Sequence, residues 1–248
     1  MQYRASFWMN VVGQFILVFV ELLALIALFI RFGNIRGWSL PEVALFYGIT
    51  HMGFAFSEGL ARGFDTFGRM VKSGEFDRLL VRPRSTLLQV AGSEVQLMRI
   101  GRIVHGGAML GWGISHLSIH WSVAKVCLIP LTLFGAICLF YGILILQATV
   151  AFWTIESLEL MHILTYGGVE AGQYPLTIYS QWLRHLFTFF IPLVCVNYLP
   201  LGLLFDAHHD LVEPQAWNYL TPLAGVLFLW CMTRFWRVGE RFYVSTGS

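Results

Sequence analysis

Long apolar runs dominate this chain of 248 residues and constrain its fold more than any other feature. A helix needs about 20 mostly apolar residues to cross the roughly 30 Å hydrocarbon core of a bilayer. Only 12% of the residues are charged, which is about half the share in a typical soluble domain. We therefore predict one all-α polytopic membrane domain over residues 1–248 with six transmembrane helices. The predicted spans are 11–30, 40–60, 97–117, 123–153, 182–204 and 219–236.

The basic residues orient these spans. Six crossings place both termini on one side of the membrane, and Lys and Arg are enriched on the cytoplasmic side. With the N-terminus inside, the outer segments hold only Arg31, Arg36 and Lys125. We therefore predict that the N- and C-termini are cytoplasmic. The segments then inside hold Arg4, Arg62, Arg69, Lys72, Arg78, Arg82, Arg84, Arg184, Arg234, Arg237 and Arg241.

Composition and motif spacing exclude several classes of function. The formal net charge is +2 and no long basic run concentrates it, so we expect no nucleic acid as a partner. The four cysteines stand singly, without the spacing of a zinc site. The chain also lacks the G-x-x-x-x-G-K-[ST] loop that cradles nucleotide phosphates. We expect no catalytic residue, no metal and no cofactor on this chain.

The most charged segment, 62–84, separates the second and third spans. Its apolar residues recur at helical spacing on both sides of Gly74, which predicts two short amphipathic helices broken at that glycine. Such a helix is too short to cross the membrane, so it rests on the bilayer interface or inserts into a groove of another protein. Amphipathicity alone leaves both open. The apolar positions are Phe64, Phe67 and Val71, then Phe76, Leu79 and Leu80.

Within this segment, residues 74–83 read GEFDRLLVRP, which resembles the G-x-x-D-x-L-L-x-R-P signature of a six-helix subgroup of ABC-2-type transporter permeases. Weaker matches follow in the same order and extend the resemblance over nearly the whole chain. They are Tyr3-Arg4, Gly37-Trp38, Phe152-Trp153, Tyr174-Pro175-Leu176, Ile191-Pro192 and Tyr243-x-Ser245-x-Gly247-Ser248.

The resemblance implies a type V exporter-like membrane domain in the bacterial cytoplasmic (inner) membrane. In such permeases, the loop between spans two and three holds a coupling helix that docks in a cleft of a separate ATPase subunit. This chain is then a transporter subunit and not an enzyme. The resemblance assigns ATPase coupling to Gly74, Glu75, Phe76, Asp77, Arg78, Leu79, Leu80, Arg82 and Pro83.

Partners follow from the same resemblance. Two copies of an ABC ATPase subunit would carry ATP and Mg²⁺. Six helices make half of the usual ABC membrane domain, so a second permease is expected, as a homodimer or a heterodimer, surrounded by membrane lipids. The cargo is not readable from the sequence.

Polar residues inside the spans are candidates for the translocation pathway. Gln14 and Glu21 share a helical face in the first span, and a carboxylate at that depth usually faces a bundle interior or cavity. A structural hydrogen bond or ion pair is an equal alternative. Pro192 should kink the span at 182–204 and is the third candidate. The possible partners of Glu21 are Arg99, Arg102 and His105.

Glycines recur in the third span at 101, 106, 107, 111 and 113. They would permit close helix contact in the small-residue manner. The alternative is the ordinary tolerance of membrane helices for glycine.

Two alternatives from other classes remain. Histidines at His116-x-x-x-His120 and in the segment 206–210 (DAHHD) could bind a transition metal, as in membrane desaturases and hydroxylases. Against this, such enzymes carry further histidine boxes on the cytoplasmic side.

The pattern Glu156-x-x-Glu159-x-x-His162 favours a helix extension beyond span four. An ATP-independent channel or lipid-handling protein is opposed only by the loop signature and its companion motifs.

Overall fold

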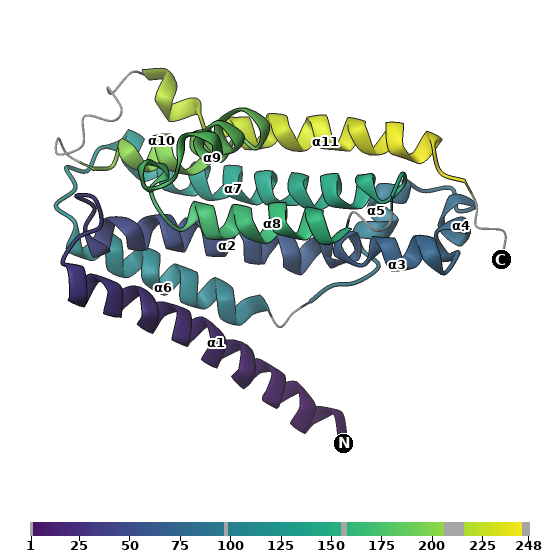
Figure 1. Ribbon diagram of the computed structural model, residues 1–248, viewed down its shortest axis with the longest axis horizontal. Coiled ribbons are helices and arrows are strands. Elements are labelled where there is room, and N and C mark those ends of the chain that lie inside the picture. The colour runs from purple at the N-terminus through teal and green to yellow at the C-terminus, as the bar shows by residue number, and fades with distance from the viewer. Residues whose placement is uncertain (1, 97–98, 155–157, 206–215, 245–248) are drawn as a thin grey trace.

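The computed structural model describes residues 2–96, 99–154, 158–205 and 216–244. Within these ranges the chain is helical and contains no β-strand. Six long helices lie roughly along the long axis of the molecule (Figure 1). They are α1 (Gln2–Phe32), α2 (Leu40–Asp65), α6 (Ile100–His116), α7 (Val123–Val150), α8 (Leu158–Gly172) and α11 (Leu223–Arg241).

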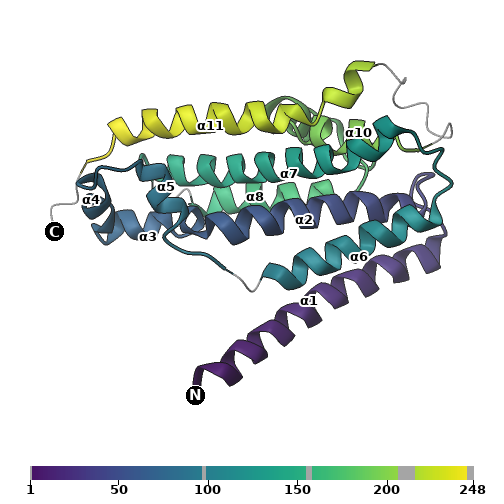
Figure 2. The ribbon, with the colours of Figure 1, turned by 180° about the vertical axis from the view of Figure 1, so that it is seen from behind.

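The bundle is organised around α2 and α7, which pack against each other. Helix α6 packs on α2, α11 packs on α7, and α8 contacts both central helices. Helix α1 contacts α6 and diverges from the bundle toward its N-terminus (Figure 2). Both termini point toward the end that carries three short helices (Figure 1). These are α3 (Phe67–Lys72), α4 (Glu75–Leu80) and α5 (Thr86–Ala91).

Local sequence signals explain where the central helices begin. Helix α2 starts with a capping box, in which the backbone N–H of Ser39 donates to the Glu42 carboxylate at 2.7 Å. Helix α7 starts at Ser122, whose hydroxyl accepts from the backbone N–H of Lys125 at 3.3 Å. Polar side chains with a free oxygen thus satisfy N–H groups that have no partner within the helix.

Glycines bring α6 close to α2, although only some of those in the predicted third span do so. A Cβ atom on Gly113 would lie 2.5 Å from Leu45 Cδ1, and one on Gly106 would lie 2.9 Å from Met52 Cγ. Added Cβ atoms at Gly101 and Gly111 would meet nothing within 4 Å. The small-residue contact is therefore a property of one face of α6.

The chain after α8 differs from the predicted span 182–204. The segments Gln181–Phe190 and Val194–Gly202 are bent by 84° relative to each other. The break falls at Ile191, which is extended because a residue that precedes a proline is pushed out of the helical region. The expected kink at Pro192 is thus confirmed, and it turns the chain by nearly a right angle. The pieces are α9 (Gln181–His185), η3 (Leu186–Phe190), η4 (Val194–Tyr198) and α10 (Leu199–Gly202).

Both ends of this bent pair lie at the end of the bundle where Trp38 is found. The Trp38 indole donates to the Thr177 hydroxyl at 3.1 Å, and the Phe205 ring packs on Trp38 with centroids 5.7 Å apart. Arg36 and Arg184 both donate to the Thr177 carbonyl, at 2.9 and 2.7 Å. The sequence had placed these two arginines on opposite sides, so this is a correction. Helix α8 runs back beside α7 (Figure 1) and was not among the predicted spans.

Among the described residues, only α7 satisfies length and hydropathy criteria for a membrane span by itself. The bent pair 181–202 satisfies them jointly. Helices α6 and α8 are short, with 17 and 15 residues, and α11 carries charged residues in its last turns.

Candidate functional site

The loop between α2 and α6 contains the two short helices that the sequence predicted. Helices α3 and α4 are separated at Gly74, which has a positive φ of 71°. Glycine adopts this left-handed conformation without steric cost, so it allows the sharp break. Glu75 and Asp77 stand in the first turn of α4, where the helix dipole favours negative charge. The prediction of two helices broken at this glycine is confirmed.

Helix α4 is fixed to the bundle by Phe76, whose side chain is 0% exposed. Its ring contacts Phe67, Phe152 and Tyr243 edge to face, with centroid distances of 5.1, 5.5 and 4.9 Å. Trp236 of α11 joins the same cluster. Since these rings come from α3, the end of α7 and the end of α11, the cluster ties the loop to two bundle helices.

The opposite side of this segment faces outward. Val81 is 84% exposed, Leu80 is 41% exposed, and Arg78 and Arg82 are also exposed. An outward face with basic and apolar side chains on a rigidly anchored helix is suited to a groove of another protein.

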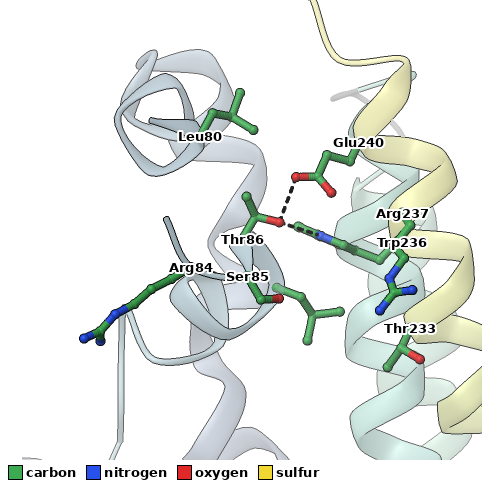
Figure 3. A pocket seen from close by; sticks show the side chains of 9 residues that line it. Leu80, Arg84, Ser85, Thr86, Thr233, Trp236, Arg237 and Glu240 are labelled. Carbon is green, nitrogen blue, oxygen red and sulfur yellow. Dashed lines mark hydrogen bonds between the residues drawn. The ribbon is translucent and has the colours of Figure 1, made fainter. Parts of the chain in front are cut away.

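Thr86, in the first turn of α5, joins the loop to α11. Its hydroxyl donates to Glu240 Oε1 at 2.9 Å and accepts from the Trp236 indole N–H at 3.2 Å (Figure 3). Gln89 then ties α5 to the preceding chain, because its amide donates to the carbonyls of Leu79 and Arg84 at 3.2 and 3.0 Å. The loop is therefore held to α11 by hydrogen bonds as well as by aromatic packing.

A charge cluster lies where this loop leaves α2. Its centre is Glu58, 1% exposed, whose carboxylate pairs with Arg62, Arg99 and Arg102. Arg62 also pairs with Asp65. Because Arg99 and Arg102 belong to the start of α6, the cluster links α6 to the end of α2.

The same cluster extends to α7 and α8. The Gln147 amide donates to Asp65 Oδ1 at 2.9 Å, and its carbonyl accepts from the Thr165 hydroxyl at 2.7 Å. His162 Nε2 lies 3.5 Å from the same Asp65 oxygen. Sequence reasoning missed this arrangement, although five charged residues near the ends of two neighbouring spans were a signal for it.

A family model described as "ABC-2 family transporter protein" matches residues 15–247. This chain belongs to the ABC-2 transporter family. The family resemblance seen in the sequence is thereby confirmed, and the chain is a membrane protein of the ABC transporter permease type rather than an enzyme. No curated protein and no solved structure matches the chain. The matched region includes the loop and the charge cluster.

The pathway candidates of this ABC-2 permease lie on separate elements. Glu21 of α1 is exposed, whereas Arg99 and Arg102, two of its three expected partners, pair with Glu58. Pro192 follows the bend at the end of the bundle opposite the loop. The side chain of Gln14 lies outside the described part of the structure. The structure therefore does not bring these three residues together into one site.

The histidine patterns of the ABC-2 permease are only partly described. His116 Nδ1 lies 2.9 Å from the carbonyl of Trp112, one turn earlier in α6. Residues 206–210 and Glu156 lie outside the described ranges. Where the structure describes the chain, no group of three or more His, Cys, Asp or Glu residues could hold a metal ion.

The phenol of Tyr243, which follows α11, has a perturbed pKa because it lies against the loop. Burial, together with the neighbouring Asp77 carboxylate, raises the pKa of Tyr243 to about 12. A negative charge on the phenol would be poorly solvated and would face a carboxylate, so the neutral form is favoured. Tyr243 thus connects the C-terminal segment of the ABC-2 permease to α4.

Proposed function

We propose that this chain is the permease subunit of an ATP-driven ABC-2 exporter, coupled to a separate ATPase subunit through the outward face of α4 in the loop between α2 and α6. The observation that carries the proposal is the two-sided construction of α4. Phe76 is buried in an aromatic cluster with α7 and α11, while Arg78, Val81 and Arg82 face outward. A force applied to the outward face is therefore transmitted to bundle helices. Membership in the ABC-2 family makes an ATPase partner the expected source of that force.

The break in α2 supplies the hinge of the proposed mechanism. Ala61 has φ −134° and ψ 29°, outside the helical range, between Glu58 and Arg62. On the loop side, Gly63 packs so closely on the Val90 carbonyl that a Cβ atom there would collide with it. Residues 62–91 then move together when α4 is displaced, and the Glu58 cluster passes the displacement to α6, α7 and α8.

The arrangement of the six long helices supports the proposed topology. Helices α1, α2, α6, α7, α8 and α11 are proposed to cross the bacterial inner membrane, with the termini and the loop in the cytoplasm. The basic residues of the loop and of α11 lie at the same end, as the positive-inside rule requires. The bent pair 181–202 enters and leaves at the outer end.

The proposed assembly contains two permeases and two ATPase subunits. This chain would form half of the translocation pathway, with an identical or related permease supplying the other half. ATP and Mg²⁺ are bound by the ATPase subunits. Helix α1, which diverges from its own bundle, is available for contact with the second permease.

Affinity purification with and without changes to the outward face tests this proposal. The tagged permease is co-expressed with candidate ATPase subunits and purified in mild detergent, as wild type and as Val81→Glu with Arg82→Glu. We expect an ATPase to co-purify with the wild type and to be lost from the double variant, because these side chains are exposed and their change leaves the aromatic cluster intact.

Leu88→Glu is the matched control, since Leu88 is exposed on α5 and outside the α4 face. It should retain the ATPase. The proposal is wrong if no ATPase accompanies the wild type, or if the double variant and the control retain it equally.

A further inference from the structure

A cavity of about 610 Å³ opens between α5 and α11 at the loop end of the bundle (Figure 3). It lies beside the Thr86 hydrogen bonds but is not filled by them. Its lining is mostly polar, and the proposed coupling mechanism does not use it. The lining residues are Leu80, Arg84, Ser85, Thr86, Leu87, Thr233, Trp236, Arg237 and Glu240.

The charges of the lining favour an anionic ligand. Arg237 lines the cavity and Arg234 stands one turn before it on α11, and both side chains are exposed. With one lining carboxylate, Glu240, the α11 side of the opening keeps one positive charge in excess. In Figure 3, Arg237 and Thr233 lie on the α11 side of the opening and Ser85 on the α5 side, whereas the Arg84 guanidinium points outward. Guanidinium and hydroxyl groups are the usual donors to phosphate oxygens. One phosphate with one negative charge balances the excess.

The surface of α11 indicates that this ligand is an amphiphile. Leu223, Leu227 and Trp230 recur at helical spacing and are 43%, 62% and 54% exposed. The same stripe continues as Arg234 and Arg237, and the Arg234 guanidinium lies 5.0 Å from the Trp230 ring centroid. The cavity therefore opens where the exposed apolar part of the stripe gives way to the basic part.

We propose that the cavity binds the headgroup of a monoanionic phospholipid that carries hydroxyl groups, such as phosphatidylglycerol. Its phosphate accepts from Arg237, Thr233 and Ser85, and a headgroup hydroxyl donates to Glu240. Its acyl chains lie along Leu223, Leu227 and Trp230. A lipid bound here bridges α5 and α11 beside the Thr86 contacts. The proposal rests only on the membrane placement of α11 and does not require an ATPase.

Native mass spectrometry of the full permease, purified without an ATPase, tests this site. The protein is titrated with phosphatidylglycerol, phosphatidylcholine and glycerol 3-phosphate, as wild type, as Thr233→Val with Arg237→Gln, and as Arg241→Gln. Arg241→Gln removes one charge from the next turn of the same stripe, outside the cavity. An unchanged midpoint of thermal unfolding confirms that each variant is folded.

We expect the wild type to retain phosphatidylglycerol in preference to phosphatidylcholine and to bind glycerol 3-phosphate only weakly. The double variant should bind phosphatidylglycerol roughly tenfold more weakly, and Arg241→Gln should stay within about twofold of the wild type. Three results would overturn the proposal. An equal loss in both variants would show general attraction to a basic stripe. Equal binding of the two lipids would show no charge recognition, and tight binding of glycerol 3-phosphate would show a site for soluble anions.

Discussion

Phe76 and Tyr243 meet edge to face, with ring centroids 4.9 Å apart and planes inclined by 84°. Phe76 belongs to α4 in the loop, whereas Tyr243 follows the last helix of the bundle. This contact closes the aromatic cluster around the segment proposed to receive the motion of an ATPase. The segment is consequently an integral part of the bundle end.

Replacing Phe76 by alanine should therefore destabilise the permease itself. Truncating a fully buried phenylalanine costs about 3–5 kcal/mol, because apolar contacts are lost and a cavity is left. We expect a clearly lower midpoint of thermal unfolding in detergent. The exposed Val81→Ala should leave that midpoint unchanged. Equal midpoints for the two variants would contradict the anchoring role of Phe76.

Titration of Tyr243 offers a pH test of the same contact. Its ordinary pKa of 10.0 is raised to about 12 in the folded chain. The stabilisation from the neutral phenol is therefore complete below pH about 10 and is lost as the pH rises through about 12. The tyrosinate absorbance of the wild type, minus that of Tyr243→Phe, should titrate near the upper value. Titration near 10 would show that the phenol is not held against Asp77.

Glycines of α6 should differ sharply in their tolerance of alanine. A Cβ atom on Gly113 would lie 2.5 Å from Leu45 Cδ1 and 2.8 Å from the Pro41 carbonyl oxygen. Forcing α6 away from α2 should cost about 1–3 kcal/mol. Gly111→Ala, on the open side of the same helix, should be neutral or slightly stabilising. The midpoints of thermal unfolding of the two variants measure this difference. Similar decreases in the midpoint for Gly113→Ala and Gly111→Ala would refute the close contact.

Replacing Glu58 by a neutral residue should leave the arginines around it without their carboxylate partner. The arginine side chains are 16–21% exposed and Arg62 keeps its contact with Asp65, so the loss should be smaller than the roughly 3–5 kcal/mol of a fully buried pair. Glu58→Gln should thus unfold at a lower temperature than the wild type. Adding Arg99→Gln should cost less than the sum of the two single changes, as expected for residues in contact. Strict additivity in this double-mutant cycle would count against the cluster.

Much of the loop was predictable because its signals are local. The alternation of apolar and charged residues around Gly74 specifies two short helices, and the positive φ of that glycine is a property of one residue. The same pattern was expected to place Phe64, Phe67 and Phe76 on the bilayer interface or in a groove of another protein, which was wrong, because all three are buried in the chain's own aromatic cluster. Their partners Phe152, Trp236 and Tyr243 lie far away in sequence, and periodicity carries no information about such distant contacts.

The contacts of the charge cluster were also not predictable from the sequence. Its residues were visible as charges near span ends, but Arg99 and Arg102 were considered as partners of Glu21 and pair with Glu58. Their assignment to Glu58 depends on how α6 crosses α2, which the close-packed glycines set.

The sequence by itself determined that this chain is helical and apolar and to which family it belongs. Only the tertiary structure decided that 182–204 is a bent pair of short segments and that Leu158–Gly172 is a long helix beside α7. Hydropathy could not separate 182–204 from α8, because an apolar segment gains as much from packing in a bundle as from lipid. Pro192 sets the break, and Asn197 holds the second piece in place: its amide donates to the Thr50 hydroxyl at 2.9 Å and to the Gly172 carbonyl at 2.7 Å. A buried amide must find such partners, and these lie on α2 and at the end of α8, which are distant in sequence.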